Sequence, residues 1–488
     1  MSTSGFIKRV RDIMRQDEGV DGDAQRISQL TWLLFLKVYD AKEQEWELMD
    51  DKYKSIIPDK FKWRNWADDK KLTGDALLAL LEDPKKGLFY TLKNLDIGPN
   101  TPIKQKIVKG VFEDANNYMK DGVLLRQVID VINEIDFSVY KERHEFGLIY
   151  ETILKELQAA GAAGEYYTPR AVTDFMVQMI NPKLGESVAD FACGTGGFLT
   201  STLKYLEPSK KTAKDIEKYN NTIFGIEKKP MPYLLCITNM LLHDVDEPKI
   251  VHGNSLEKKV QEYTDKDKFD VILMNPPYGG TEKENVKNNF PADLRSSETA
   301  DLFMSVIMYR LKKNGRCAVI IPDGFLFGQD NAKINIKKRL LESFNLHTVV
   351  RMPKSVFAPY TSITTNILFF DSKDKTKETW FYRMDLPEGY KAFSKTKPIE
   401  LKHFDKVIEW WKNRKEIKDG DFFKARKYSK SELENLNYNL DLCGFPHEEE
   451  IILEPNELIS KFKKERAEYS KQLDDILDKI MEIVNDKN

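Results

Sequence analysis

Short apolar runs rich in β-branched residues alternate with helix-like segments between Ser187 and Phe370, and this alternation constrains the fold most strongly. Runs such as FDVILMN and GRCAVIIP are apolar throughout and do not alternate with polar residues, which is typical of strands buried on both faces. Strands separated by helices predict an α/β fold with a doubly wound, mostly parallel sheet. The last runs, GRCAVIIP, LHTVVRMP and TSITTNILFF, lie close together, which predicts an antiparallel pair at one edge of the sheet.

The first 145 residues contain no β-rich run and show helix-like periodicity. A broad apolar face extends from Ala24 to Met49, and apolar residues recur at three- and four-residue steps from Val123 to Ile135. Each stretch predicts a helix that buries one face. We therefore expect an independent helical domain ahead of the sheet.

A lysine-rich segment follows Asp371. Residues 391–430 hold 13 Lys and Arg against 6 Asp and Glu, a local net charge of +7. Six aromatic residues are interleaved with these charges: Phe393, Phe404, Trp410, Trp411, Phe422 and Phe423. Two interpretations stay open, a helical surface whose aromatic side chains pack inward and a patch that faces nucleic-acid phosphates.

The stretch from Asn456 to Val484 predicts a highly charged helix with one continuous apolar stripe. The stripe consists of Leu473, Ile476, Leu477, Ile480, Met481 and Val484. Such a helix either folds back on its own core or docks on a helix of a partner protein.

The charges nearly cancel over the whole chain, since 76 Lys and Arg stand against 78 Asp and Glu for a net charge of −2. This balance excludes a protein that coats nucleic acid by being basic overall. No apolar run reaches the ~18 residues of a membrane span, and the first residues lack the apolar core of a secretory signal. The 4 cysteines include no C-x-x-C and the 6 histidines no metal-binding spacing, which predicts no metal site and a cytoplasmic location.

A glycine-rich turn, in the segment ADFACGTGGF, follows the first strand of the predicted sheet. Gly194, Gly196 and Gly197 permit a tight turn and let the backbone approach a ligand closely. Because the chain has no G-x-x-x-x-G-K-[ST] motif, the turn predicts a nucleotide site of another kind than a triphosphate-binding loop.

Two polar residues follow the next strands. Glu227 ends the run TIFGIE, where an acid is placed to accept hydrogen bonds from both ribose hydroxyls of a bound adenosine. The alternative is a surface glutamate beside Lys228 and Lys229. Asn254 follows the run KIVHG and is a candidate hydrogen-bond partner for an adenine edge.

The segment FDVILMNPPYG carries the clearest chemistry, because a buried strand delivers Asn275, Pro276, Pro277 and Tyr278 to the carboxyl edge of the sheet. An exocyclic amine is a poor nucleophile, since its lone pair is delocalised into the ring. The Asn275 side-chain oxygen and the Pro276 carbonyl can each accept one amine N–H, which stabilises the charge that develops during methyl transfer. The prolines stiffen the loop, and Tyr278 offers a face on which an extruded base stacks.

In their order along the chain, GEYYTPRAV, ADFACGTGGF, IEKKP and NPPY resemble the motifs of gamma-type amino-group DNA methyltransferases. The segments WLLFLKVYD, HDVDEP, IPDGFLFG and NYNLDLCGF extend the resemblance to the methylation subunits of type I restriction–modification systems. The resemblance implies a helical domain over 1–145 and a Rossmann-like S-adenosylmethionine-dependent methyltransferase domain over 146–400. It also implies a C-terminal region over 401–488, with a helical tail for partner docking.

The resemblance also implies roles for individual residues. The catalytic loop is Asn275, Pro276, Pro277 and Tyr278, and Tyr278 and Phe357 would stack on the flipped adenine. Asn254 stands where many relatives carry Asp. The residues expected to bind S-adenosyl-L-methionine are Glu165, Tyr166, Tyr167, Thr168, Pro169, Arg170, Asp190, Gly194, Thr195, Gly196, Gly197, Glu227 and Asn254.

The implied activity is methylation of the N6 amino group of adenine in double-stranded DNA. The implied partners are a specificity subunit that reads the DNA site, a second methylation subunit in an M2S1 complex, and a restriction subunit for cleavage. Three alternatives stay open: a self-sufficient adenine or N4-cytosine DNA methyltransferase, a protein-glutamine methyltransferase, and a cofactor-binding scaffold without turnover. Cytosine enzymes more often carry Ser or Asp in place of Asn275.

Overall fold

The structure is a computed structural model that describes residues 3–135, 168–358, 361, 363–445 and 455–485. It divides into two compact units, Met1–Gly444 and Phe445–Asn488, and each is described by itself. Among the described residues, no helix combines the length and the apolar character needed to span a membrane.

The N-terminal part of the first unit is helical, as predicted. Its α-helices are α1 Thr3–Met14, α2 Gly22–Met49, α3 Trp63–Trp66, α4 Gly74–Glu82, α5 Leu88–Lys93, α6 Ile103–Glu113 and α7 Gly122–Asn133. The apolar stretches expected to form helices correspond to α2 and α7. The Asp121 side chain caps α7 by accepting hydrogen bonds from the backbone N–H groups of Val123 and Leu124.

These helices share one hydrophobic core with part of the sheet domain. The core joins side chains such as Trp32 and Phe112 to Leu199, Leu235 and Ile250. The apolar faces of the predicted N-terminal helices are thus buried partly against the helices that cover the sheet.

The sheet has ten strands in the order β3-β2-β1-β4-β5-β7-β6-β8-β10-β9. Strands β1 to β5 pair in parallel, as the continuous apolar runs predicted. Their bounds are β1 Val188–Asp190, β2 Ile223–Glu227, β3 Lys249–His252, β4 Phe269–Met274 and β5 Leu311–Pro322. The others are β6 Asn345–Arg351, β7 Thr365–Asp371, β8 Glu378–Arg383, β9 Ile417–Asp419 and β10 Phe422–Ser429.

Strand β7 pairs antiparallel with both β5 and β6, so the antiparallel strands predicted from the closely spaced runs are present. They do not lie at the edge of the sheet, because β8, β10 and β9 continue beyond β6. These extra strands come from the lysine-rich part of the chain, whose alternating polar residues concealed them. Within that part Phe393, Phe404 and Trp410 are buried, as the inward-packing interpretation expected, whereas Phe422 is exposed.

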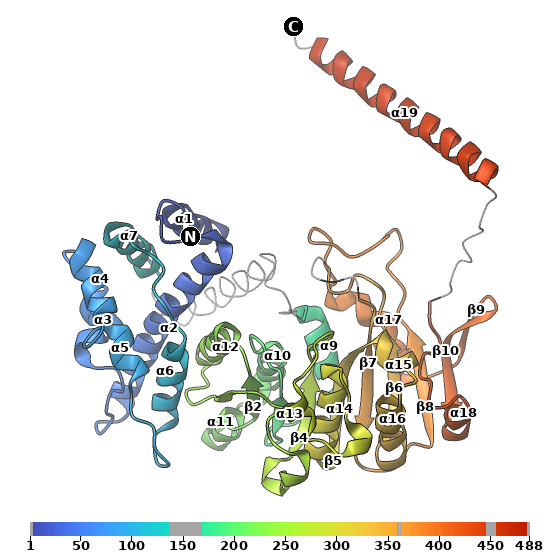
Figure 1. Cartoon of the computed structure of the whole chain (residues 1–488), viewed down its shortest axis with the longest axis horizontal. Helices are drawn as coiled ribbons and strands as arrows, with labels where there is room; N and C mark the ends of the chain where they lie inside the picture. Colours follow the sequence, from blue (N-terminus) through green and yellow to red (C-terminus); the bar gives the residue numbers. More distant parts are fainter. Residues whose placement is uncertain (1–2, 136–167, 359–360, 362, 446–454, 486–488) are drawn as a thin grey trace. The chain divides into compact units, whose positions relative to one another are not determined.

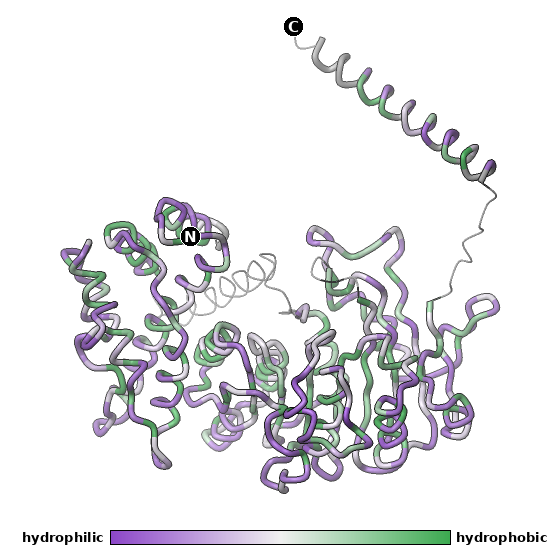
Figure 2. The backbone as a smooth tube through the Cα atoms, viewed as in Figure 1, coloured by the Kyte–Doolittle hydropathy of each residue, from purple (hydrophilic) through white to green (hydrophobic). Residues whose placement is uncertain are grey.

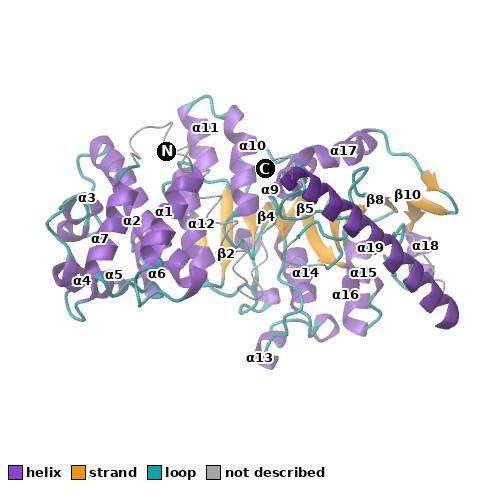
Figure 3. Cartoon of the chain, turned by 90° about the horizontal axis from the view of Figure 1, so that it is seen from above, coloured by secondary structure: helices purple, strands orange, loops and turns teal. Residues whose placement is uncertain are grey.

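Helices cover both faces of the sheet. In Figure 3, α9, α10 and α17 lie on one side of the strands and α14, α15 and α16 on the other. Figure 2 shows hydrophobic stretches along the strands and mostly hydrophilic loops at the rim. The helices of this part are α9 Arg170–Ile180, α10 Gly197–Leu206, α11 Ala213–Asn220, α12 Pro230–Leu242, α13 Glu284–Lys287, α14 Thr299–Arg310, α15 Asp323–Phe327, α16 Asn331–Ser343, α17 Asp405–Lys412 and α18 Lys430–Asn435.

The second unit contains one long helix, α19 Pro455–Asn485, which confirms the helix expected from Asn456 to Val484. Three members of the predicted stripe, Leu473, Ile476 and Leu477, are at least half exposed. The side chains of the remaining members, Ile480, Met481 and Val484, lie outside what the structure describes.

Candidate active site

A cavity of about 310 Å³ lies where β1, β2, β3 and β4 reach their carboxyl ends. Parallel strands bring these ends to one edge of the sheet, which is where open α/β sheets bind ligands. Ten of the residues predicted for the site line this cavity: Thr168, Asp190, Gly194, Thr195, Gly197, Glu227, Asn254, Asn275, Pro276 and Pro277.

The glycine-rich turn between β1 and α10 has the geometry that only glycine adopts readily. Gly194 and Gly196 have φ angles of 53° and 85°. A Cβ on Gly196 would lie 2.9 Å from Cys236 Sγ, and one on Gly197 would lie 2.7 Å from Arg170 Nη1. Arg170 therefore lies close behind the turn and is not among the residues that line the cavity.

Glu227 is buried at the end of β2, so the interpretation as a surface glutamate is wrong. Its Oε2 accepts a hydrogen bond of 2.8 Å from the backbone N–H of Gly194, and its Oε1 accepts one of 2.7 Å from that of Lys229. These two charge-assisted bonds fix the orientation of the carboxylate at the cavity wall.

Two further polar residues lie at the ends of β1 and β3. The pKa of Asp190 is raised to about 8, mainly by burial; the hydrogen bond from Ala192 N–H lowers it and the nearby charge of Glu227 raises it. The side-chain oxygen of Asn254 accepts a hydrogen bond of 3.1 Å from the backbone N–H of Leu256. This bond fixes the Asn254 amide at the cavity wall.

The loop after β4 brings Asn275 into the cavity beside Thr168, although the two residues are far apart in sequence. Asn275 Nδ2 donates a hydrogen bond of 3.0 Å to Thr168 Oγ1, and its Oδ1 accepts one from the Tyr278 hydroxyl. Both ends of the amide are therefore held. The loop is closed by Thr299, whose hydroxyl donates a 2.8 Å bond to the Gly280 carbonyl.

Some predicted residues lie elsewhere. Pro169 immediately precedes α9 and, in the described structure, does not line the cavity. Phe357 is buried, and Tyr278 packs against the hydrophobic cluster that contains it. Their predicted stacking on a base stays a prediction. Glu165, Tyr166 and Tyr167 lie outside the described residues.

The motif search missed the apolar wall of the cavity. Helix α12 contributes Met231, Pro232 and Leu235, and helix α14 contributes Thr299 and Phe303. The available signal was the sequence of α12, PMPYLLCITNMLL, which is apolar on all sides and therefore typical of a fully buried helix.

Comparisons with known proteins show the family of this chain. The family model for N-6 DNA methylases matches residues 141–451, and the model for the HsdM N-terminal domain matches residues 3–132. The methylase subunit of the type I restriction enzyme EcoEI from Escherichia coli is 49% identical over 490 residues, which cover 98% of each chain.

Solved structures show the same relationship. One is a crystal structure of a modification subunit, from Vibrio vulnificus YJ016, ascribed to a type I restriction enzyme. It is 42% identical, has a TM-score of 0.79, and the match covers 88% of this chain and 92% of that one. A chain from a study of type I restriction–modification complex assembly is 33% identical, with a TM-score of 0.79 and coverage of 99% and 98%. The chain therefore belongs to the N-6 DNA methylase family, among the methylation subunits of type I restriction enzymes.

Proposed function

We propose that this chain is the methylation subunit of a type I restriction–modification system. It transfers a methyl group from S-adenosyl-L-methionine to the N6 amino group of adenine in double-stranded DNA. The observation that carries the proposal is the shared cavity, in which Asn275 and its prolines lie together with Glu227 and the glycine-rich turn.

The residues of the cavity fit this cofactor. Its volume of about 310 Å³ suits a small molecule, and the turn at Gly196 has no room for a side chain. Glu227 supplies acceptors for ribose hydroxyls, Asn254 an amide for the adenine edge, and α12 an apolar wall. When bound there, S-adenosylmethionine supplies a methyl group on a positively charged sulfur.

The chain's own contribution to the reaction is to hold and polarise the target amine. Asn275 Oδ1 and the Pro276 carbonyl accept the two amine hydrogens, which favours a nucleophilic nitrogen and stabilises its developing charge. The Tyr278 hydroxyl donates to Oδ1 here, and the second lone pair of that oxygen can accept an amine hydrogen. No base is needed before transfer, because the cationic product amine loses its proton to water.

The target adenine must leave the duplex to reach Asn275, at a cost of a few kcal/mol. Tyr278 and Phe357 are assigned to stacking on the extruded base, which contributes roughly 1–3 kcal/mol. Movement of Tyr278 away from Asn275 would present its ring to the extruded base. The lysine-rich segment 391–430 is a candidate contact to DNA phosphates.

Recognition of the DNA sequence is assigned to a separate specificity subunit, with two methylation subunits in an M2S1 complex and a restriction subunit for cleavage, in the cytoplasm. The exposed residues Leu473, Ile476 and Leu477 of α19 suit docking on helices of the specificity subunit. The assigned domains are 1–145, 146–400 and 401–488, and β9 and β10 extend the catalytic sheet into the last of these.

The catalytic assignment is tested with Asn275→Ala in the complex with the specificity subunit. Methyl transfer should be abolished, whereas the affinity for S-adenosylhomocysteine, measured by calorimetry, should stay within about twofold of wild type. Transfer at close to the normal rate would contradict the assignment. If the variant also lost its affinity for S-adenosylhomocysteine, the loss of methyl transfer would be explained by binding. Asn275 would then act in binding and not in catalysis.

The partner assignment is tested by deletion of residues 455–488. The truncated chain should bind S-adenosylhomocysteine normally but should no longer co-purify with the specificity subunit. An intact complex would contradict docking through α19.

A further inference from the structure

Helix α12 is part of the cavity wall. Met231, Pro232 and Leu235 line the cavity. Further along the helix, Asn239 Nδ2 donates a hydrogen bond of 3.2 Å to the Thr195 carbonyl in the glycine-rich turn. A shift of α12 would therefore change both the wall and the turn.

The same helix packs against α2 and α6 of the N-terminal helical region. Gly110 of α6 lies directly over Tyr233 of α12, and a Cβ at Gly110 would lie 3.1 Å from Tyr233 Oη and 3.3 Å from Cε1. Glycine weakens a helix interior, so its presence in α6 is explained by this close approach. Tyr233 is itself buried.

Tyr233 also contacts the other side of the cavity. Its ring stacks on His252, with centroids 4.9 Å apart and planes at 17°. His252 ends β3, and the next two residues, Gly253 and Asn254, line the cavity. Tyr233 thus lies between the N-terminal region and two separate parts of the cavity wall.

Charged contacts fix this junction. Lys42 of α2, whose side chain is only 7% exposed, lies 3.2 Å from Asp244 and 3.0 Å from Asp246 in the loop that follows α12. Lys104 of α6 lies 3.4 Å from Glu247 in the same loop. Because Lys42 is nearly buried, these ion pairs are screened less by solvent than surface pairs.

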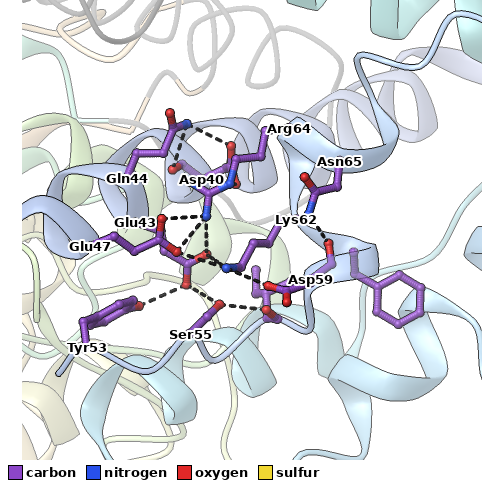
Figure 4. A network of polar contacts seen from close by, with 12 residues as sticks. Asp40, Glu43, Gln44, Glu47, Tyr53, Ser55, Asp59, Lys62, Arg64 and Asn65 are labelled. Atoms are coloured by element: carbon purple, nitrogen blue, oxygen red, sulfur yellow. Dashed lines mark hydrogen bonds and ion pairs between the residues drawn. The ribbon is translucent and has the colours of Figure 1, made fainter. Parts of the chain in front are cut away.

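Helix α2 also makes charged contacts on its other side. Figure 4 shows Asp40, Glu43 and Glu47 of α2 facing Lys62 and Arg64. Arg64 Nη2 lies 2.7 Å and Lys62 Nζ 3.0 Å from Glu47 Oε1. Charge-assisted contacts of this kind are stronger than neutral ones, so α2 forms a stiff support for α12.

We propose that the N-terminal helical region sets the shape of the cofactor cavity through α12, with Tyr233 as the positioning residue. This inference rests on the proposed function, which places S-adenosylmethionine in that cavity. Binding free energies are reciprocal. A region that shapes the cavity is therefore itself stabilised when the cavity is filled.

The first experiment measures the affinity of the full chain for S-adenosylhomocysteine by calorimetry. Gly110→Ala should weaken binding about fivefold, because the new Cβ must displace Tyr233. Alanine favours helix over glycine, so this loss cannot arise from a weaker α6. Gly98→Ala is the matched control, since the nearest atom to its Cβ is 4.0 Å away, and binding should be unchanged.

Adding Tyr233→Phe to Gly110→Ala removes the Oη atom that the new Cβ approaches, and it should restore the affinity to within about twofold of wild type. A defect at Gly110 that does not act through Tyr233 would not be rescued in this way. Equal affinities for Gly110→Ala, Gly98→Ala and wild type would overturn the proposal. Failure of the wild-type chain itself to bind would instead overturn the proposed function.

A second experiment needs no substitution. Hydrogen exchange of the wild-type chain should slow in α6 around Gly110 when S-adenosylhomocysteine is added, as well as in the glycine-rich turn. Protection of the turn with no change in α6 would overturn the inference while leaving the proposed cofactor site intact.

Discussion

Thr168 and Asn275 form a hydrogen bond whose loss should slow methyl transfer at saturating cofactor. The substitution Thr168→Val removes the hydroxyl that accepts the 3.0 Å bond from Asn275 Nδ2 and keeps a branched side chain of similar size. Asn275 would then lose one of the two contacts that hold its amide in the orientation needed to accept the target amine.

The size of the effect follows from the surroundings of the bond. A neutral hydrogen bond contributes about 0.5–1.5 kcal/mol net. Thr168 and Asn275 are both half-buried, so water can replace the lost partner and the lower part of this range applies. A loss of about 0.5–1 kcal/mol in the transition state slows methyl transfer about twofold to fivefold.

The assay is single-turnover methyl transfer at saturating cofactor and DNA, with the specificity subunit present. Thr168→Ser keeps the hydroxyl and is the matched control, expected within twofold of wild type. The affinity of each variant for S-adenosylhomocysteine is measured as well, because Thr168 lines the cavity. Equal transfer rates for Thr168→Val and Thr168→Ser would refute the positioning role, as would a rate loss explained entirely by weaker binding.

Two other substitutions test the polar wall of the cavity. Glu227→Gln places an amide donor against the N–H of Gly194 or Lys229. The Kd for S-adenosylhomocysteine, measured by calorimetry, should therefore rise roughly 10- to 100-fold. An unchanged Kd would contradict the role of Glu227. Asp190 has a pKa raised to about 8 by burial, so between about pH 4 and pH 8 the folded chain retains a proton that the unfolded chain releases. Its carboxyl therefore lowers stability as the pH rises, by up to about 1.4 kcal/mol per pH unit. Urea unfolding should show wild type losing stability relative to Asp190→Asn from pH 5 to pH 8, and parallel profiles would show that Asp190 does not titrate in this range.

The position of the site could be predicted from sequence because it depends on strand order along the chain. Asp190 and Glu227 end their strands and Asn254 closely follows β3, and parallel strands bring such positions to one edge. Glu227 and Asn275 consequently line one cavity although they come from different strands. The predicted positions of Glu227 and Asn275 required no knowledge of side-chain packing.

Other contacts could not be predicted, because they depend on packing between distant segments. The bond between Thr168 and Asn275 joins residues with no periodic relation in sequence. The contact of Gly110 with Tyr233 joins two helices that pattern analysis assigns to separate domains. Strand β10, FFKARKYS, was missed because its charges dominate the pattern, although Ala425 within it is fully buried.

The identity of the methylated base tests the proposed function most directly. The full chain, together with its specificity subunit, is incubated with radiolabelled S-adenosylmethionine and duplex DNA, and the nucleosides are separated after digestion. The label is expected in N6-methyladenine, and it should be absent when Asn275→Ala replaces the wild-type chain. Label in N4-methylcytosine or in protein, or no transfer at all, would contradict the proposal.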